Sequence, residues 1–134
     1  MDFGSSFIVG GQIQGEPPRL FLVYPEGNFI EATADTPYFQ IGETKYGKPI
    51  LDRVIDYDTS LDDGIKCALI SIDSTIRSNL SVGLPLDVLR YRRASFIATE
   101  HFNVDEHHEG FHQLGEAWSV GLRDVFHRIP NLKW

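Results

Sequence analysis

The sequence is poor in cysteine and in positive charge, and it has no long hydrophobic run. Its one cysteine, Cys67, excludes an intramolecular disulfide and gives no sign of an oxidising compartment. Only 12 lysines and arginines stand against 19 acidic residues, and the net charge of -7 argues against a nucleic-acid or anionic-membrane partner. No stretch approaches the roughly 18 apolar residues of a membrane helix, and the N-terminus lacks the parts of a signal peptide. A cytoplasmic protein is therefore predicted.

What the sequence does contain is enough hydrophobic chain for a single domain over residues 1–134. Of its 134 residues 42% are hydrophobic, which suffices for one core and not for two. The first third predicts antiparallel strands at residues 7–13, 20–24 and 29–32, the last two joined by a turn. Both alternating sets of residues 20–24 are apolar, so this strand should be covered on both faces.

Two helices are predicted in the middle of the chain. The first begins at Pro49, because the missing N–H of proline costs nothing in the first helical turn. The second is capped by Thr59 or Ser60, and it should end around residues 78–80, ahead of a glycine and a proline. Cys67 lies among apolar residues of this second helix and is predicted to pack in the core.

The last third predicts a hairpin and a long helix. The hairpin strands are expected at residues 86–91 and 95–99, and the helix at residues 105–127, ended by Pro130. One apolar stripe should run along that helix, formed by Phe111, Leu114, Trp118, Leu122, Val125 and Ile129. Strands, two helices, strands and a helix predict an α+β layered protein rather than an alternating parallel one.

Three long stretches carry a likeness to a known family. They are residues 17–32 (PPRLFLVYPEGNFIEA), residues 38–55 (YFQIGETKYGKPILDRVI) and the closing residues 122–134 (LRDVFHRIPNLKW). In these stretches the chain resembles the bacterial proteasome-type peptidases of the Anbu (ancestral beta-subunit) group, relatives of proteasome beta subunits and of the HslV peptidase. The resemblance covers nearly the whole chain and is patchiest between residues 101 and 115.

This resemblance implies both a fold and an activity. The fold is the C-terminal half of an N-terminal-nucleophile protein, a four-layer α-β-β-α sandwich in which two sheets stack and helices lie outside each. The activity of the complete protein would be amide-bond hydrolysis in peptides or unfolded proteins, without a cofactor. Relatives in this family self-associate into rings or spirals, so the same is expected here.

The nucleophile is the feature that the resemblance leaves unplaced. In this family it is the first residue of the mature chain, a threonine whose own α-amino group helps to activate it. The sequence opens Met1-Asp2, and Asp2 has no suitable hydroxyl. Ser5 and Ser6 would need a cleavage that nothing in the sequence signals. This chain alone is therefore predicted to lack the nucleophile and to be inactive as a peptidase.

Residues 75–82 match a supporting segment of the family site. Relatives have Thr-x-Arg-Asp-x-x-Ser-Gly there, with the aspartate and the serine beside the nucleophile, whereas this chain reads TIRSNLSV. Ser81 matches the serine, Ser78 stands where the aspartate would be, and Asn79 can supply a substitute hydrogen bond. The alternative is that these side chains only satisfy carbonyls at a helix C-terminus.

Residues 42–48 (GETKYGK) have the spacing of a phosphate-binding loop. Such a loop continues with a serine or threonine that binds magnesium, whereas this one continues with Pro49, which also lacks an N–H for phosphate. In the resembling family this turn enters a helix near the catalytic centre, with Gly42 and Glu43 closest. A plain turn with close backbone packing is the alternative, and no cofactor is predicted.

Histidines and acidic residues gather between residues 101 and 116. His108, His112 and Glu116 are spaced four apart, so they would share one face of a helix and could hold zinc. The same pattern is typical of the solvated face of an acidic amphipathic helix, and the resembling family needs no metal. We therefore predict no metal site, with these three residues as the alternative.

Three functions of different classes remain open on the sequence. The first is part of a threonine-type peptidase, to which Gly42, Glu43, Ser78, Asn79 and Ser81 would contribute support. The second is a non-catalytic scaffold or assembly subunit of a proteasome-like oligomer. The third is an unrelated metal- or ligand-binding module, which only the histidine cluster favours.

Overall fold

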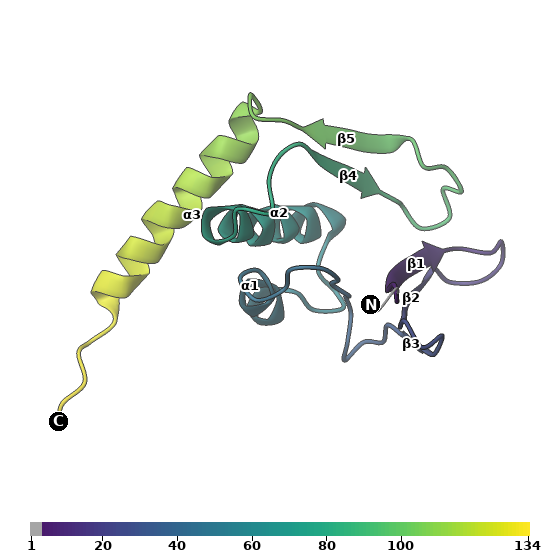
Figure 1. The fold of residues 1–134 in the computed structure, drawn as a ribbon, viewed down its shortest axis with the longest axis horizontal. Helices are drawn as coiled ribbons and strands as arrows, with labels where there is room; N and C mark the ends of the chain where they lie inside the picture. Colours follow the sequence, from purple (N-terminus) through teal and green to yellow (C-terminus); the bar gives the residue numbers. More distant parts are fainter. Residues whose placement is uncertain (1–3) are drawn as a thin grey trace.

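The structure, a computed structural model, describes residues 4–134, so the predicted opening at Met1 and Asp2 lies outside it. The elements follow in the order β1 (Phe7–Gly11), β2 (Arg19–Val23), β3 (Phe29–Glu31), α1 (Lys48–Val54), α2 (Leu61–Ser78), β4 (Leu86–Arg90), β5 (Glu100–Val104) and α3 (Glu109–Arg128). This order confirms the predicted α+β class. In Figure 1 the strands β1–β3 lie on one side of α1 and α2, and α3 lies on the other.

The strands β1, β2 and β3 form an antiparallel sheet with β2 at its centre. They lie within about two residues of the predicted bounds, the usual uncertainty of strand and helix ends. Leu22 of β2 pairs with Ile8 on one side and with Ile30 on the other. All of β1 and β3 is exposed, and residues 20–24 are half-buried. The covering expected on both faces of this strand is therefore incomplete within residues 4–134.

The helices α1 and α2 begin where their capping residues predict. Pro49 occupies the first turn of α1. Ser60 is the N-cap of α2, and its hydroxyl oxygen accepts from the Asp63 amide at 3.1 Å while its proton is donated to the Asp63 carboxylate at 3.1 Å. This reciprocal pairing satisfies an amide that the helix itself leaves free. Of the two predicted capping residues, Thr59 and Ser60, the structure thus confirms Ser60.

A small core lies where α1 crosses α2. Cys67 is 3% exposed and Ser71 2% exposed on α2, and Leu51 of α1 is buried beside them. The packing is close at Gly47, where an added Cβ would lie 1.9 Å from the Ser71 hydroxyl oxygen and 3.1 Å from the Ser71 carbonyl oxygen. The core position predicted for Cys67 is confirmed, and burial raises the pKa of its thiol.

The second strand of the predicted hairpin was placed wrongly. The sequence suggested residues 95–99, whereas the strand that pairs with β4 is Glu100–Val104, with Arg90 opposite Glu100. Ala94 and Phe96 have φ values of 60° and 52°, in the left-handed region that ends a strand. The Gln12 side chain holds this loop, because its oxygen accepts from the Ala94 amide at 2.7 Å. Tertiary contact thus overrides the β propensity of residues 95–99.

The helix α3 is packed over its first half and free over its second. It begins at Glu109 rather than at the predicted residue 105. Phe111 is buried, and Leu114 and Trp118 are half-buried against the rest of the chain. Leu122, Val125 and Ile129 continue the predicted stripe but are exposed. Figure 1 shows this second half projecting away from the body of the fold.

The chain exposes far more surface than a compact protein of its size. Its accessible area is 10362 Å², whereas a compact 15.2 kDa monomer exposes about 7,100 Å². Large apolar side chains contribute to this surface, since Phe7, Phe29 and Phe126 are each more than half exposed. Among residues 4–134 no helix is long and apolar enough to cross a membrane.

We expect Gly47→Ala to lower the free energy of unfolding by about 1–3 kcal/mol, because the new methyl group overpacks the contact with buried Ser71. The matched control is Gly64→Ala in α2, where a Cβ meets nothing within 4 Å. That change should raise helix stability by about 0.5–1 kcal/mol. Urea unfolding of both variants is the measurement. Equal effects would show that the helices do not meet as closely as described.

The ion pairs of Glu100 across β4 and β5 should make the stability of the fold depend on pH in the acidic range. Hydrogen bonds from Arg90, and then from Arg92, hold the pKa of Glu100 below its ordinary value. A lowered pKa means that the stabilisation is fully present above the pKa of the unfolded chain and is lost as pH falls through the folded value. Glu100→Gln should therefore flatten the fall of melting temperature with acid. Glu106→Gln, at an exposed residue, is the control and should leave that fall unchanged.

Candidate active site

The residues predicted from the family motif gather at the C-terminal end of α2. Asn79 is the C-cap residue of this helix, and its amide donates to the Thr75 carbonyl at 2.8 Å. The turn at Gly42, where φ is 83°, leads towards α1. A positive φ favours glycine, so Gly42 lets the chain present Glu43 at this point. The packing of α1 on α2 then brings Glu43 to Asn79.

A hydrogen-bonded network joins Glu43, Asn79 and Ser81. The Asn79 amide nitrogen donates to the Glu43 carboxylate at 3.0 Å, across 36 positions of sequence. The Asn79 side-chain oxygen accepts from the Ser81 backbone amide at 2.9 Å and from the Ser81 hydroxyl at 2.7 Å. The other Glu43 oxygen accepts from the Lys45 backbone amide at 3.2 Å. These bonds fix the orientation of all three side chains.

Solvent exposure increases along this network from Glu43 and Asn79 to Ser81. Glu43 and Asn79 are half-buried, whereas Gly42, Ser78 and Ser81 are exposed. The Ser78 hydroxyl makes no hydrogen bond among residues 4–134, so the structure does not bring it into the network. Of the five predicted residues, four therefore lie together and Ser78 lies next to them in the chain. Their catalytic role stays a prediction.

The network can orient and polarise a hydroxyl, but it contains no activated nucleophile. In the part of the chain that is described, no serine, threonine or cysteine side chain is hydrogen-bonded to a histidine or a lysine. Cys67 is buried, and its thiol pKa is raised, so its reactive thiolate form is disfavoured. The described residues of this site therefore provide acceptors and a carboxylate, and no activated nucleophile.

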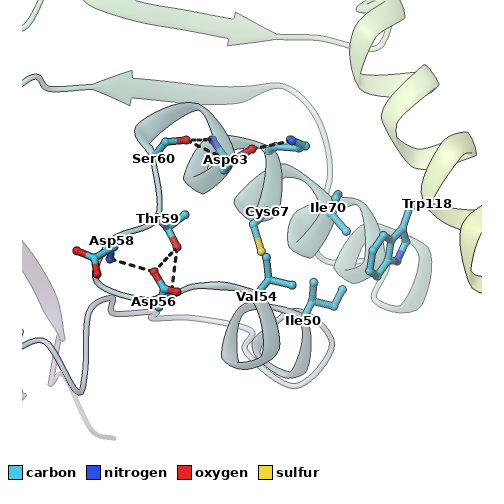
Figure 2. Close-up of a pocket in the computed structure, with 11 residues that line it drawn as sticks. Ile50, Val54, Asp56, Asp58, Thr59, Ser60, Asp63, Cys67, Ile70 and Trp118 are labelled. Carbon is cyan, nitrogen blue, oxygen red and sulfur yellow. Dashed lines mark hydrogen bonds and ion pairs between the residues drawn. The ribbon is translucent and has the colours of Figure 1, made fainter.

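A separate open cavity of about 480 Å³ lies between α1, α2 and α3. Figure 2 shows its apolar side, with Ile50, Val54 and Trp118, and the aspartates at its edge. Two of these aspartates make local bonds: Asp56 accepts from the Asp58 backbone amide at 2.9 Å and from the Thr59 hydroxyl at 3.1 Å, and Asp63 accepts from the Lys66 ammonium at 2.7 Å. The cavity lining includes the Cys67 thiol, whose pKa is raised by burial, and no histidine that could activate it, so the cavity is not the candidate site.

The histidine cluster is engaged in local backbone contacts. His108 is the N-cap of α3, and its Nδ1 accepts from the Phe111 amide at 3.1 Å. His112 Nε2 contacts the Glu106 carbonyl oxygen at 2.7 Å. Glu116 is exposed on α3. Within residues 4–134 no three potential ligands come together to hold a metal ion, so the proposed face of His108, His112 and Glu116 does not converge.

The glycine-rich turn at residues 42–48 is likewise occupied by local contacts. The Lys48 ammonium donates to both oxygens of Asp52 at 2.9 Å, and the Tyr38 hydroxyl donates to the same carboxylate at 2.5 Å. These bonds, from Tyr38 first and then Lys48, lower the pKa of Asp52, and burial is the main cause that raises the pKa of Tyr38. Lys48 is thus directed to its own helix rather than to a phosphate.

Removal of the Asn79 side chain should cost stability out of proportion to its size. Asn79→Ala removes the donor to one oxygen of the half-buried Glu43 carboxylate, and we expect the free energy of unfolding to fall by about 1–2 kcal/mol. Ser78→Ala, one residue earlier and exposed, is the control and should change it by less than about 0.5 kcal/mol. Chemical denaturation compares the two. An equally small change in both variants would show that the bond from Asn79 to Glu43 contributes little to stability.

Comparison with known proteins identifies the family of this chain. The proteasome subunit family matches residues 1–88. Three solved structures are similar: Anbu (ancestral beta-subunit) from Yersinia bercovieri at 57% identity and a TM-score of 0.94, Anbu from Hyphomicrobium sp. strain MC1 at 55% and 0.92, and the helical assembly of the Anbu complex from Pseudomonas aeruginosa at 54% and 0.94. No match was found among curated proteins.

The alignments cover nearly all of this chain but only part of each similar structure. The alignments cover 99%, 96% and 99% of this chain, in the same order. They cover only 57%, 56% and 55% of the three similar chains. The chain thus spans little more than half the length of these structures. By its sequence match and its fold, the chain belongs to the proteasome subunit family and is similar to the Anbu proteins of that family.

Proposed function

We propose that this chain is the C-terminal half of a proteasome-like, N-terminal-nucleophile peptidase of the threonine type. The complete protein would hydrolyse amide bonds of peptides or unfolded proteins in the cytoplasm, without a metal or cofactor. Residues 1–134 would complete a single four-layer domain with the other half. The observation that carries this proposal is a close match in fold, with a TM-score of 0.94, over only 57% of the similar Anbu chain.

The exposed surface supports the same proposal. The chain exposes about 3,200 Å² more than a compact monomer of its mass would. Both edge strands of the sheet, β1 and β3, are exposed, and this is unfavourable in water because the apolar side chains of Phe7, Val9 and Phe29 stay in contact with solvent. A second layer packed on β1–β3 would remove this area and complete the sandwich.

This chain alone would be inactive, because the nucleophile would belong to the other half of the domain. The network of Glu43, Asn79 and Ser81 holds a polar group in place but starts no reaction. The attacking hydroxyl and the amine that activates it would come from the other half. This chain would then contribute the support on which that amine rests.

A non-catalytic scaffold or assembly subunit is the second candidate. The observation that favours this candidate is the exposed apolar surface on the second half of α3. Leu122, Val125 and Phe126 are exposed there, on a helix that projects from the fold. The P. aeruginosa protein is described as a helical assembly, which makes self-association into a ring or spiral a reasonable expectation for this chain as well. A stable, soluble oligomer of the 134-residue chain without turnover would favour this candidate.

The peptidase proposal is tested with two proteins and a fluorogenic peptide. The chain of 134 residues should give no turnover, whereas a longer protein that begins at a mature threonine should cleave the peptide. Replacement of that threonine by alanine, or a threonine-peptidase inhibitor, should abolish cleavage. The intact mass of the protein from its source cells states which of the two forms exists. Inhibitor-sensitive turnover by the 134-residue chain itself would contradict the proposal.

A further inference from the structure

The direction of every proton in the Glu43–Asn79–Ser81 network is fixed by chemistry. A backbone N–H can only donate, so the Asn79 atom that faces the Ser81 amide must be the oxygen. A carboxylate can only accept, so the Asn79 nitrogen faces Glu43. The Ser81 hydroxyl meets the same Asn79 oxygen and must donate its proton there. Its oxygen is therefore left as an acceptor.

The charge at the far end of this network makes that acceptor stronger. Glu43 brings a carboxylate to Asn79, and each hydrogen bond in a chain polarises the next. Among residues 4–134 the ion pairs include none to Glu43, whereas the nearby Arg77 is paired with Asp73 at 3.0 Å. The negative charge of Glu43 is thus not neutralised locally, and it is passed on through Asn79 towards exposed Ser81.

The network also bears on the aspartate that the family motif has and this sequence lacks. Ser78 stands where the resembling family has an aspartate, and its hydroxyl is exposed and outside the network. Glu43 reaches the same end of α2 from a loop that lies 36 positions earlier. A carboxylate is therefore present at the site, although it comes from another part of the chain.

The family motif implies that Ser81 lies beside the α-amino group of the N-terminal nucleophile. We propose that Glu43 and Asn79 are positioning residues that take the place of the motif aspartate: they orient the Ser81 hydroxyl as an acceptor for that amine and supply the negative charge. This inference rests on the proposed function for the identity of that amine. Ser81 is the one member of the network that is exposed to receive a group from the other half. Glu43 stabilises the amine in its protonated form without touching it.

The test uses the longer protein that carries the mature threonine. Glu43→Gln keeps the shape and can still accept from Asn79, but it removes the charge. We expect kcat for a fluorogenic peptide to fall about 10-fold with KM unchanged, since a hydrogen bond to a charged group is replaced by one to a neutral group. Glu26→Gln, in the exposed turn between β2 and β3, is the control and should leave both constants as they are.

A double variant separates charge from structure. In Glu43→Gln with Asn79→Asp, the new glutamine can donate to the new aspartate, which can still accept from the Ser81 amide and hydroxyl. The hydrogen bonds are kept, and the charge is restored one residue closer to Ser81. We expect kcat to recover to within about 3-fold of the parent protein. Failure to recover in a variant that melts at the parent temperature would overturn the role of the charge.

A second readout does not depend on turnover. The pKa of the N-terminal α-amino group is measured by competitive acylation at a series of pH values, with the product counted by mass spectrometry. A nearby carboxylate favours the ammonium form, so this pKa should fall in Glu43→Gln and rise again in the double variant. The same value in all three proteins would overturn the inference.

The two failures can be told apart. A parent protein with no inhibitor-sensitive turnover would overturn the proposed peptidase function, whatever the amine does. A parent protein with turnover, whose kcat and amine pKa are both indifferent to Glu43, would keep the function and overturn the positioning role. An amine pKa that responds to Glu43 in a protein without turnover would support the arrangement alone.

Discussion

The close crossing of α1 and α2 at Gly47 is the constraint on which the rest of the structure depends. With no side chain at Gly47, the start of α1 can lie against buried Ser71, and the loop before α1 then reaches the end of α2. Glu43 meets Asn79 only because the two helices are this close. A packing requirement in the core therefore determines the geometry of a polar site at the surface.

The exposed surface shows which parts of the chain are packed and which are left uncovered. The chain has a well-ordered core between its helices, yet it leaves a sheet face and half of α3 uncovered. Such surfaces are rare on independent domains and are normal on parts of larger assemblies. The division between covered and uncovered surface thus separates what these residues stabilise by themselves from what they leave to a partner.

Much of this fold could be predicted from local signals. Pro49 and Ser60 set the helix starts. The family resemblance singled out Gly42, Glu43 and Ser81 as site candidates, with Asn79 as a substitute donor, and their role in catalysis stays a prediction. The bond from Asn79 to Glu43 could not be predicted, because it joins residues 36 positions apart through tertiary packing. The strand at residues 95–99 was wrong for a similar reason, and the periodicity of α3 cannot say whether its stripe is buried within one chain or against another.

The half-packed state of α3 has a mechanical consequence. The helix is held to α2 where Gly115 lies against Asp73, and a Cβ there would come within 2.7 Å of a carboxylate oxygen. From that pivot to Arg128 the helix extends about 20 Å, so a tilt of about 5° moves its end by nearly 2 Å. A helix held at one end in this way converts a small change of packing angle into a larger displacement of its far end. The absence of a side chain at Gly115 would then determine the angle of α3, and with it the orientation of any protein bound to the second half of this helix.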